Sequence, residues 1–125
     1  MKRRSRQDRQ QARRRGIAAE TLCVWLLRLK GYRILARDLR TPVGEIDIVA
    51  RRGRTLVAVE VKRRGRMEDA AEAIGRDQRR RILRALGWFA QRQPDGDRLS
   101  LRFDAMLLDG GLLPRHIRDA WREGV

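Results

Sequence analysis

The chain has 125 residues, of which 42% are hydrophobic and 38% are charged, and its net charge is +15 at pH 7. This length fits one globular domain and is too short for two. So large a positive charge favours a polyanion as the partner, with nucleic acid first and an anionic membrane surface second. The single cysteine, Cys23, excludes an intramolecular disulfide and a thiolate metal cluster.

The sequence shows neither a membrane span nor a signal peptide. Its apolar run at 22–29 is far shorter than the roughly 20 residues that a bilayer requires. The basic N-terminus is not followed by the hydrophobic stretch that a signal peptide needs. We therefore expect a cytoplasmic protein with no membrane partner.

The N-terminal part of the chain divides into a basic segment and an apolar helix. Residues 1–15 hold eight basic residues and one acid, and we expect a mobile arm or a frayed helix extension there. This segment either contacts a polyanion or is a solvated tail. From Gly16 to Leu29 the pattern predicts a helix that is apolar on nearly every side and is capped by Gly31. Glu20 is the only acid of this helix, on the stripe expected to face the core.

Three strands are predicted next, at 32–40, 44–51 and 54–63. The Thr41-Pro42 pair ends the first strand, and Arg52-Gly53 forms a tight turn between the second and the third. Both strands of this hairpin are rich in β-branched residues.

The C-terminal half adds a helix and one or two strands. Apolar residues at helical spacing predict a helix at 68–91, with Gln78 on its inward stripe. Alternating residues predict a strand at 99–108, and 112–121 is expected to form a short strand or a helical turn. The order αβββαβ predicts a single α/β domain at 16–125, with a mixed central sheet flanked by helices.

Charged residues in the middle of the hairpin are its most informative feature. Because strand side chains alternate, Glu45 and Asp47 are expected on one face of their strand, with Ile46 and Ile48 on the other. In the second strand Glu60 and Lys62 share a face. Charges in such an apolar hairpin are rarely found unless they are paired or bind a metal.

Asp47, Glu60 and Lys62 together have the chemistry of a phosphodiester-cleaving site. Two carboxylates on adjacent strands supply part of the oxygen shell that Mg²⁺ or Mn²⁺ prefers. A lysine beside them would lower the pKa of an attacking water or stabilise charge in the transition state. The alternative is a cross-strand salt bridge on an exposed sheet face.

The hairpin also resembles a known family. Gly-Glu-Ile-Asp-Ile-Val-Ala at 44–50, followed by Val-Glu-Val-Lys-Arg at 59–63, is similar to the YraN-like family of uncharacterised bacterial proteins. That family is placed by fold in the PD-(D/E)xK nuclease superfamily, which is restriction-endonuclease-like and close to archaeal Holliday-junction resolvases. The resemblance extends over about residues 16–121, and the sequence departs from the family pattern at Ala19, Asp38 and Gln78.

The resemblance implies roles for individual residues. Asp47 and Glu60 would bind the metal together with the backbone carbonyl of Val61, Lys62 would be catalytic, and Glu20 would be an accessory acid. From their positions alone, Glu45 is either a further acid of the site or a surface residue. Gln78 either positions a water or phosphate, or is a half-buried amide.

Two functions from different classes follow from these observations. The first is a Mg²⁺-dependent endonuclease that acts on structured or branched DNA. The second is a non-catalytic nucleic-acid-binding module, bound to DNA or RNA. By analogy with resolvases, which cut two strands symmetrically, we expect a homodimer. The candidate phosphate contacts are arginines at the hairpin ends and on the second helix: Arg51, Arg52, Arg63, Arg64, Arg79 and Arg80.

Overall fold

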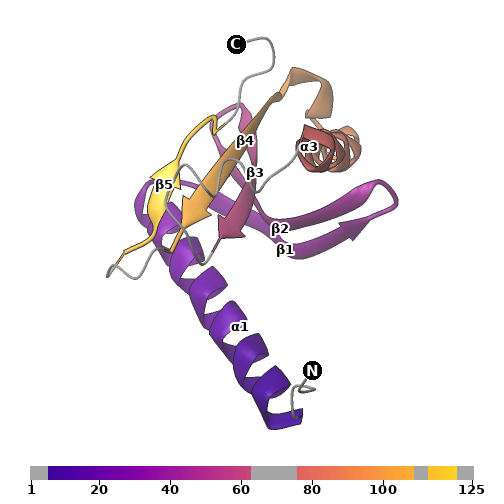
Figure 1. Ribbon diagram of the computed structural model, residues 1–125. Coiled ribbons are helices and arrows are strands. Elements are labelled where there is room, and N and C mark those ends of the chain that lie inside the picture. The colour runs from indigo at the N-terminus through magenta and orange to yellow at the C-terminus, as the bar shows by residue number, and fades with distance from the viewer. Residues whose placement is uncertain (1–5, 63–75, 109–112, 121–125) are drawn as a thin grey trace.

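The computed structural model describes residues 6–62, 76–108 and 113–120. A five-stranded sheet lies at its centre, with strands in the order β1-β2-β3-β4-β5 (Figure 1). The elements are α1 (Arg6–Leu29), β1 (Arg33–Thr41), β2 (Gly44–Arg52), β3 (Thr55–Lys62), α3 (Arg76–Gln91), the 3₁₀ turn η1 (Gly96–Arg98), β4 (Ser100–Leu107) and β5 (Arg115–Ile117).

The α/β fold with the order αβββαβ is confirmed. Strands β1, β2 and β3 form an antiparallel meander, β4 pairs with β3 in parallel, and β5 pairs with β4 in antiparallel orientation, so the sheet is mixed. The undecided segment at 112–121 contains the short strand β5. The second helix is described from Arg76, and its expected first turns at 68–75 lie outside the described residues.

Helix α1 begins ten residues before the boundary expected at Gly16. It runs without a break from Arg6 and extends well beyond the sheet at its N-terminal end (Figure 1). Its other end is the predicted glycine cap. Gly31 has φ +92°, its N–H donates to the Arg28 carbonyl at 3.0 Å, and the Tyr32 N–H donates to the Leu27 carbonyl at 3.0 Å. These two hydrogen bonds form the Schellman motif, which commonly ends a helix.

Two apolar clusters bury the sheet on both faces. Helix α3 contributes Ile82 and Leu86 to one cluster, and α1 contributes Val24 and Leu27 to the other. Each fully buried aliphatic side chain of this kind stabilises the fold by about 1.5–3 kcal/mol. The two helices therefore fix the sheet from opposite sides.

The prediction that Ile46 and Ile48 lie on the same face of their strand is wrong. Ile46 belongs to the cluster beneath α3, whereas Ile48 belongs to the cluster beneath α1. Simple alternation fails between them, beside a point where the neighbouring strand is irregular. Asp38, which lies between the partners of Ile48 and Ile46 in β1, has φ +47° instead of an extended conformation. The change of face occurs at Asp47.

Candidate functional site

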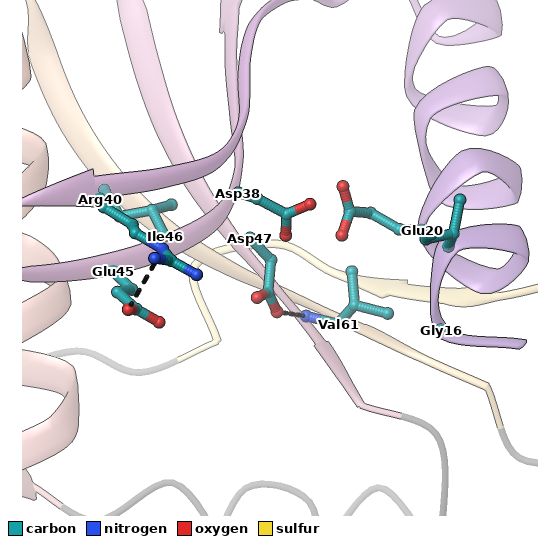
Figure 2. A pocket seen from close by; sticks show the side chains of 9 residues that line it. Gly16, Glu20, Asp38, Arg40, Glu45, Ile46, Asp47 and Val61 are labelled. Carbon is teal, nitrogen blue, oxygen red and sulfur yellow. Dashed lines mark hydrogen bonds and ion pairs between the residues drawn. The ribbon is translucent and has the colours of Figure 1, made fainter. Parts of the chain in front are cut away.

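The β2–β3 hairpin brings Asp47 and Glu60 together. Its ladder pairs Ile48 with Val59, so Asp47 and Glu60 are the next opposing residues. The carboxylate of Asp47 accepts a hydrogen bond from the Val61 N–H at 2.9 Å (Figure 2). This bond fixes the carboxylate of Asp47 against β3, at the point where the ladder ends.

The two carboxyl groups share a hydrogen bond, and their pKa values respond in opposite ways to it. Burial and the nearby charge of Asp47 raise the pKa of Glu60 to about 7. Burial also raises the pKa of Asp47, but the Val61 N–H and the hydrogen bond from Glu60 oppose this increase. Glu60 is therefore the group that keeps the proton, and Asp47 is the one that ionises first.

Lys62 lies beside this pair, as the sequence predicted. Its Nζ atom is 3.9 Å from Oε1 of Glu60, and its side chain is 28% exposed. The ammonium group lowers the pKa values of both carboxyl groups. The interaction is long and partly solvated, so Lys62 does not neutralise the acids as a close buried ion pair would.

Glu20 approaches the site from α1. Only 9% of this residue is exposed, and its Oε1 accepts a hydrogen bond from Nε of Arg37 at 2.9 Å. A second bond, from Nη2 of Arg37 to the hydroxyl of Thr21 at 3.0 Å, ties β1 to the helix. Burial raises the pKa of Glu20 against the opposing effect of Arg37. The accessory acid implied by the resemblance is thus at the site and is already paired.

Asp38 is a site residue that was not predicted from the sequence. Its carboxylate points toward that of Glu20 and lies near Asp47 (Figure 2), and it raises the pKa values of both groups. One signal was available, because an acid in the middle of a predicted strand was the same criterion that singled out Asp47. The left-handed backbone of Asp38, which aspartate tolerates better than most residues, could not be anticipated from the pattern.

Glu20, Asp38 and Asp47 line an open cavity of about 710 Å³ between α1 and the first three strands. A second cavity, of about 410 Å³, lies on the α3 side of Asp47. Asp47 and Glu45 border both, and Glu60, Gln78 and Arg81 border the second. Gln78 therefore faces the site, whereas Glu45 is exposed and has only a loose 3.7 Å ion pair with Arg40.

Close packing of β2 against α3 shapes the second cavity. A Cβ atom added at Gly44 would lie 3.3 Å from the carbonyl oxygen of Arg81 and 3.6 Å from its Cβ. Only a residue without a side chain lets the helix backbone approach the strand so closely. Gly44 thus sets the distance between Arg81 and the carboxylates.

The donor set at the site consists of two carboxylates and one backbone carbonyl. In the ranges that the structure describes, no three His, Cys, Asp or Glu side chains lie close enough to bind one ion. The N–H and C=O of a strand residue point to the same side, so the carbonyl of Val61 lies on the Asp47 side together with its N–H. Asp47, Glu60 and this carbonyl are oxygen ligands of the type that Mg²⁺ accepts, with water completing the shell.

The candidate phosphate contacts have different surroundings. Arg51 donates to both carboxylate oxygens of Asp95, at 3.0 and 2.6 Å, and to the Gly53 carbonyl. Arg52 lies over the ring of Tyr32, with its Cζ atom 4.5 Å from the centroid. Arg79 is half-buried and Arg80 is exposed on α3. Arg63 and Arg64 lie outside the described residues.

A different buried acid, Asp104 of β4, belongs to a polar network around β5. Its carboxylate accepts hydrogen bonds from Nε and Nη2 of Arg102, both at 2.8 Å, from Nε2 of His116 at 2.7 Å and from the Asp119 N–H at 2.9 Å. Although burial opposes it, this bonding lowers the pKa of Asp104 to about 2. The side chain of His116 is buried and is part of this network.

Fold and site together define an α/β protein with a largely buried acid pair that opens to solvent at the end of a hairpin. The chain belongs to the family described as "Uncharacterised protein family UPF0102", which matches residues 19–108. It is 55% identical over 111 residues to a UPF0102 protein of Parvibaculum lavamentivorans, covering 89% of this chain and 84% of that protein. It is 48% identical over 106 residues to one from Nitrobacter winogradskyi, covering 85% and 90%. It is 47% identical over 117 residues to one from Paramagnetospirillum magneticum, covering 90% and 91%.

No helix among the described residues is long and apolar enough to cross a membrane.

Proposed function

We propose that this protein is a Mg²⁺-dependent endonuclease of the PD-(D/E)xK type that hydrolyses phosphodiesters in structured or branched DNA. One observation supports this most directly. Asp47 and Glu60 are held together and largely buried beside two solvent-open cavities, and among the described residues the sole ion pair of Glu60 is the long one to Lys62. A protein gains no stability from such an arrangement, and a divalent cation would reverse its electrostatic cost.

The side chains fit the metal that this proposal requires. Asp47, Glu60 and the Val61 carbonyl would hold Mg²⁺ or Mn²⁺. The ion, when bound, lowers the pKa of a coordinated water and stabilises charge on the phosphate oxygens. Glu60 must lose its proton before it becomes a ligand. We therefore expect metal affinity to increase as the pH rises through about 7, the pKa of Glu60 in the metal-free protein.

Other residues of the site have supporting roles. Lys62 places a positive charge next to the carboxylates, where it stabilises negative charge in the transition state. Gln78 and Arg81 line the α3 side of the cavity, where they contact the phosphate that is cut or the next one. Glu20 fixes Arg37 and thereby joins α1 to β1. The positive charge of the chain attracts the substrate and makes its binding dependent on salt.

Partners and location follow from the same proposal. DNA is favoured over RNA by the resemblance to junction-resolving nucleases, and two copies cutting opposite strands favour a homodimer. A cytoplasmic location places the protein with its substrate. The second candidate is a nucleic-acid-binding module without catalysis. The positive charge of the chain supports this second candidate as well. The acids of the site count against it, because they would repel phosphate.

The decisive test is a cleavage assay of the wild type and the Asp47→Asn variant on single-stranded, duplex, flapped and four-way-junction DNA. Mg²⁺, Mn²⁺ and EDTA are compared on each substrate. Asp47→Asn removes the charge that holds the ion, so we expect cleavage to fall by at least about 10³-fold, which is about 4 kcal/mol of transition-state stabilisation. DNA binding in EDTA should persist or become tighter, since a charge that repels phosphate is gone.

Lys62→Arg serves as a charge-conserving companion variant. A guanidinium is larger than an ammonium group, and its positive charge is spread over a plane. We therefore expect cleavage to fall sharply while binding is retained. Equal cleavage by the wild type and Asp47→Asn would reveal a contaminating nuclease and would leave the binding module as the better account.

A further inference from the structure

A third cavity, of about 320 Å³, lies at the opposite end of β2 from Asp47. It is bordered by the start of β1, the end of β2, and the two turns next to them. No carboxylate borders it. Its lining residues are Gly31, Arg33, Arg51, Arg52 and Gly53.

The three arginines of this cavity are crowded by the strand pairing. Arg33 and Arg51 are direct partners in the β1–β2 ladder, and like charges in such positions destabilise a sheet. Asp95 compensates Arg51, with a 2.6 Å contact between Nη2 and Oδ2. Within 6–62, 76–108 and 113–120, no acid forms an ion pair with Arg33 or Arg52. Two positive charges around one cavity therefore have no acidic partner in the described part of the fold.

Part of the cavity wall is already fixed in place. Besides lying over Tyr32, the guanidinium of Arg52 donates from Nη1 to the Lys30 carbonyl at 3.3 Å. Gly31 and Gly53 have φ of +92° and +62°, which allow the chain to turn at the cavity edge without a side chain filling it. An anion entering the cavity would find Arg52 positioned in advance, so little side-chain entropy would be lost on binding.

The length of β2 relates this cavity to the acid pair. From Asp47 to Arg52 is five residues, or about 17 Å at roughly 3.4 Å per residue. The phosphates of one DNA strand wind around the duplex as well as advancing along its axis, so a straight distance of this size spans only a few nucleotide steps.

We propose that this arginine cavity binds a backbone phosphate of the nucleic acid, a few nucleotide steps from the phosphate held at Asp47 and Glu60. The inference rests on the proposed function for the identity of the substrate. It adds that the substrate has a continuous duplex arm long enough to reach from the acid pair to the far end of β2. Arg33 and Arg52 supply the contact, and Arg51 supports the wall through Asp95.

The test measures binding of a fluorescein-labelled duplex of roughly 20 base pairs by fluorescence anisotropy, in EDTA and over a series of salt concentrations. Arg33→Gln is compared with Arg118→Gln, which removes another exposed arginine, from the turn after β5. We expect Arg33→Gln to weaken binding about 3–10-fold and to reduce the slope of log affinity against log salt by about 1. Arg118→Gln should change affinity less than about twofold. Equal losses in the two variants would overturn the proposal.

A charge reversal separates binding from folding. Arg33→Glu places a carboxylate opposite Arg51, so we expect the melting temperature to rise while DNA affinity falls more than in Arg33→Gln. A residue with only a structural role would not move these two measurements in opposite directions, and a fall in both would count against the cavity.

The outcome is also distinct from that of the cleavage assay. Binding that depends on Arg33 without any cleavage would support the phosphate site and contradict the proposed nuclease activity. Cleavage with binding that is insensitive to Arg33 would do the reverse.

Discussion

Glu60 and Asp104 lie on the neighbouring parallel strands β3 and β4, and both are largely or wholly buried, yet their carboxyl groups differ in charge state. Asp104 accepts four hydrogen bonds and has a pKa of about 2. Glu60 has another acid as its partner and a distant lysine, and its pKa is raised to about 7. Both carboxyl groups are largely removed from water, so the difference in their protonation comes from the groups that they contact.

Asp104 therefore stabilises the fold, whereas Glu60 destabilises the metal-free protein. Arg102, His116 and the Asp119 N–H compensate the desolvation of Asp104, and the charged form is the stable one. Within the described part of the chain, Glu60 has only the 3.9 Å ion pair with Lys62 to compensate it. Buried polar groups left in this state are characteristic of functional sites.

The largest effect that we expect from this comparison is on folding. Asp104→Asn keeps the shape but removes the charge, so Arg102 would be buried without its partner. We expect the free energy of unfolding to fall by about 3–5 kcal/mol, as measured by urea denaturation. A loss below about 1 kcal/mol would show that the network contributes little, and the contrast with Glu60 would then disappear.

Substitution of Glu60 is expected to increase the free energy of unfolding, by an amount that depends on pH. The pKa of Glu60 is raised from 4.5 to about 7 by folding, so the metal-free protein loses stability as pH rises through this window. Glu60→Gln removes that loss, and we expect a gain of about 1–3 kcal/mol at pH 8 that falls below about 1 kcal/mol at pH 5. Denaturation in EDTA at both pH values measures it, and an equal effect at the two would contradict a titrating Glu60.

Asp104 provides the internal control for that pH profile. Its pKa is lowered from 3.8 to about 2, so its contribution is fully present above pH 3.8 and is lost as pH falls toward 2. The two acids therefore act in separate pH ranges and with opposite signs.

The smallest effect is expected at Glu45, which is an acid of the same hairpin without burial. Its ion pair with Arg40 joins two side chains that are 76% and 86% exposed. We expect Glu45→Gln to change the free energy of unfolding by less than about 0.5 kcal/mol at either pH. A change as large as that of Glu60→Gln would mean that net charge, and not burial, governs both.

The hairpin and its acid pair could be predicted from the sequence because their determinants are local. The Arg52-Gly53 turn fixes the register of two β-branched strands, and that register places Asp47 opposite Glu60. Asp38 was not identified because its approach to Glu20 depends on where α1 packs, which no strand pattern encodes. Ile46 and Ile48 were placed together because alternation assumes regular strands, and the neighbouring strand is irregular at Asp38.

Strand β4 shows a second limit of pattern reasoning. Apolar residues alternate from Leu99 to Leu107, which predicted a strand, but Leu101 at one of these positions is 42% exposed whereas Asp104 and Met106 between them are buried. The centre of the sheet is covered on both sides, so residues of both parities are enclosed there. The alternation therefore gave no indication that Asp104 is buried.

The mixed sheet has a consequence for how the protein is made. Asp47 and Glu60 are 13 residues apart in one antiparallel hairpin, whereas Val59 meets its parallel partner Asp104 only after 45 further residues have been synthesised. Local contacts form before distant ones, so the acids meet early, while β4 is still missing and water still surrounds them. Their mutual repulsion is then screened. The two acids are therefore desolvated last, when the remaining contacts of the sheet have formed and hold them in place.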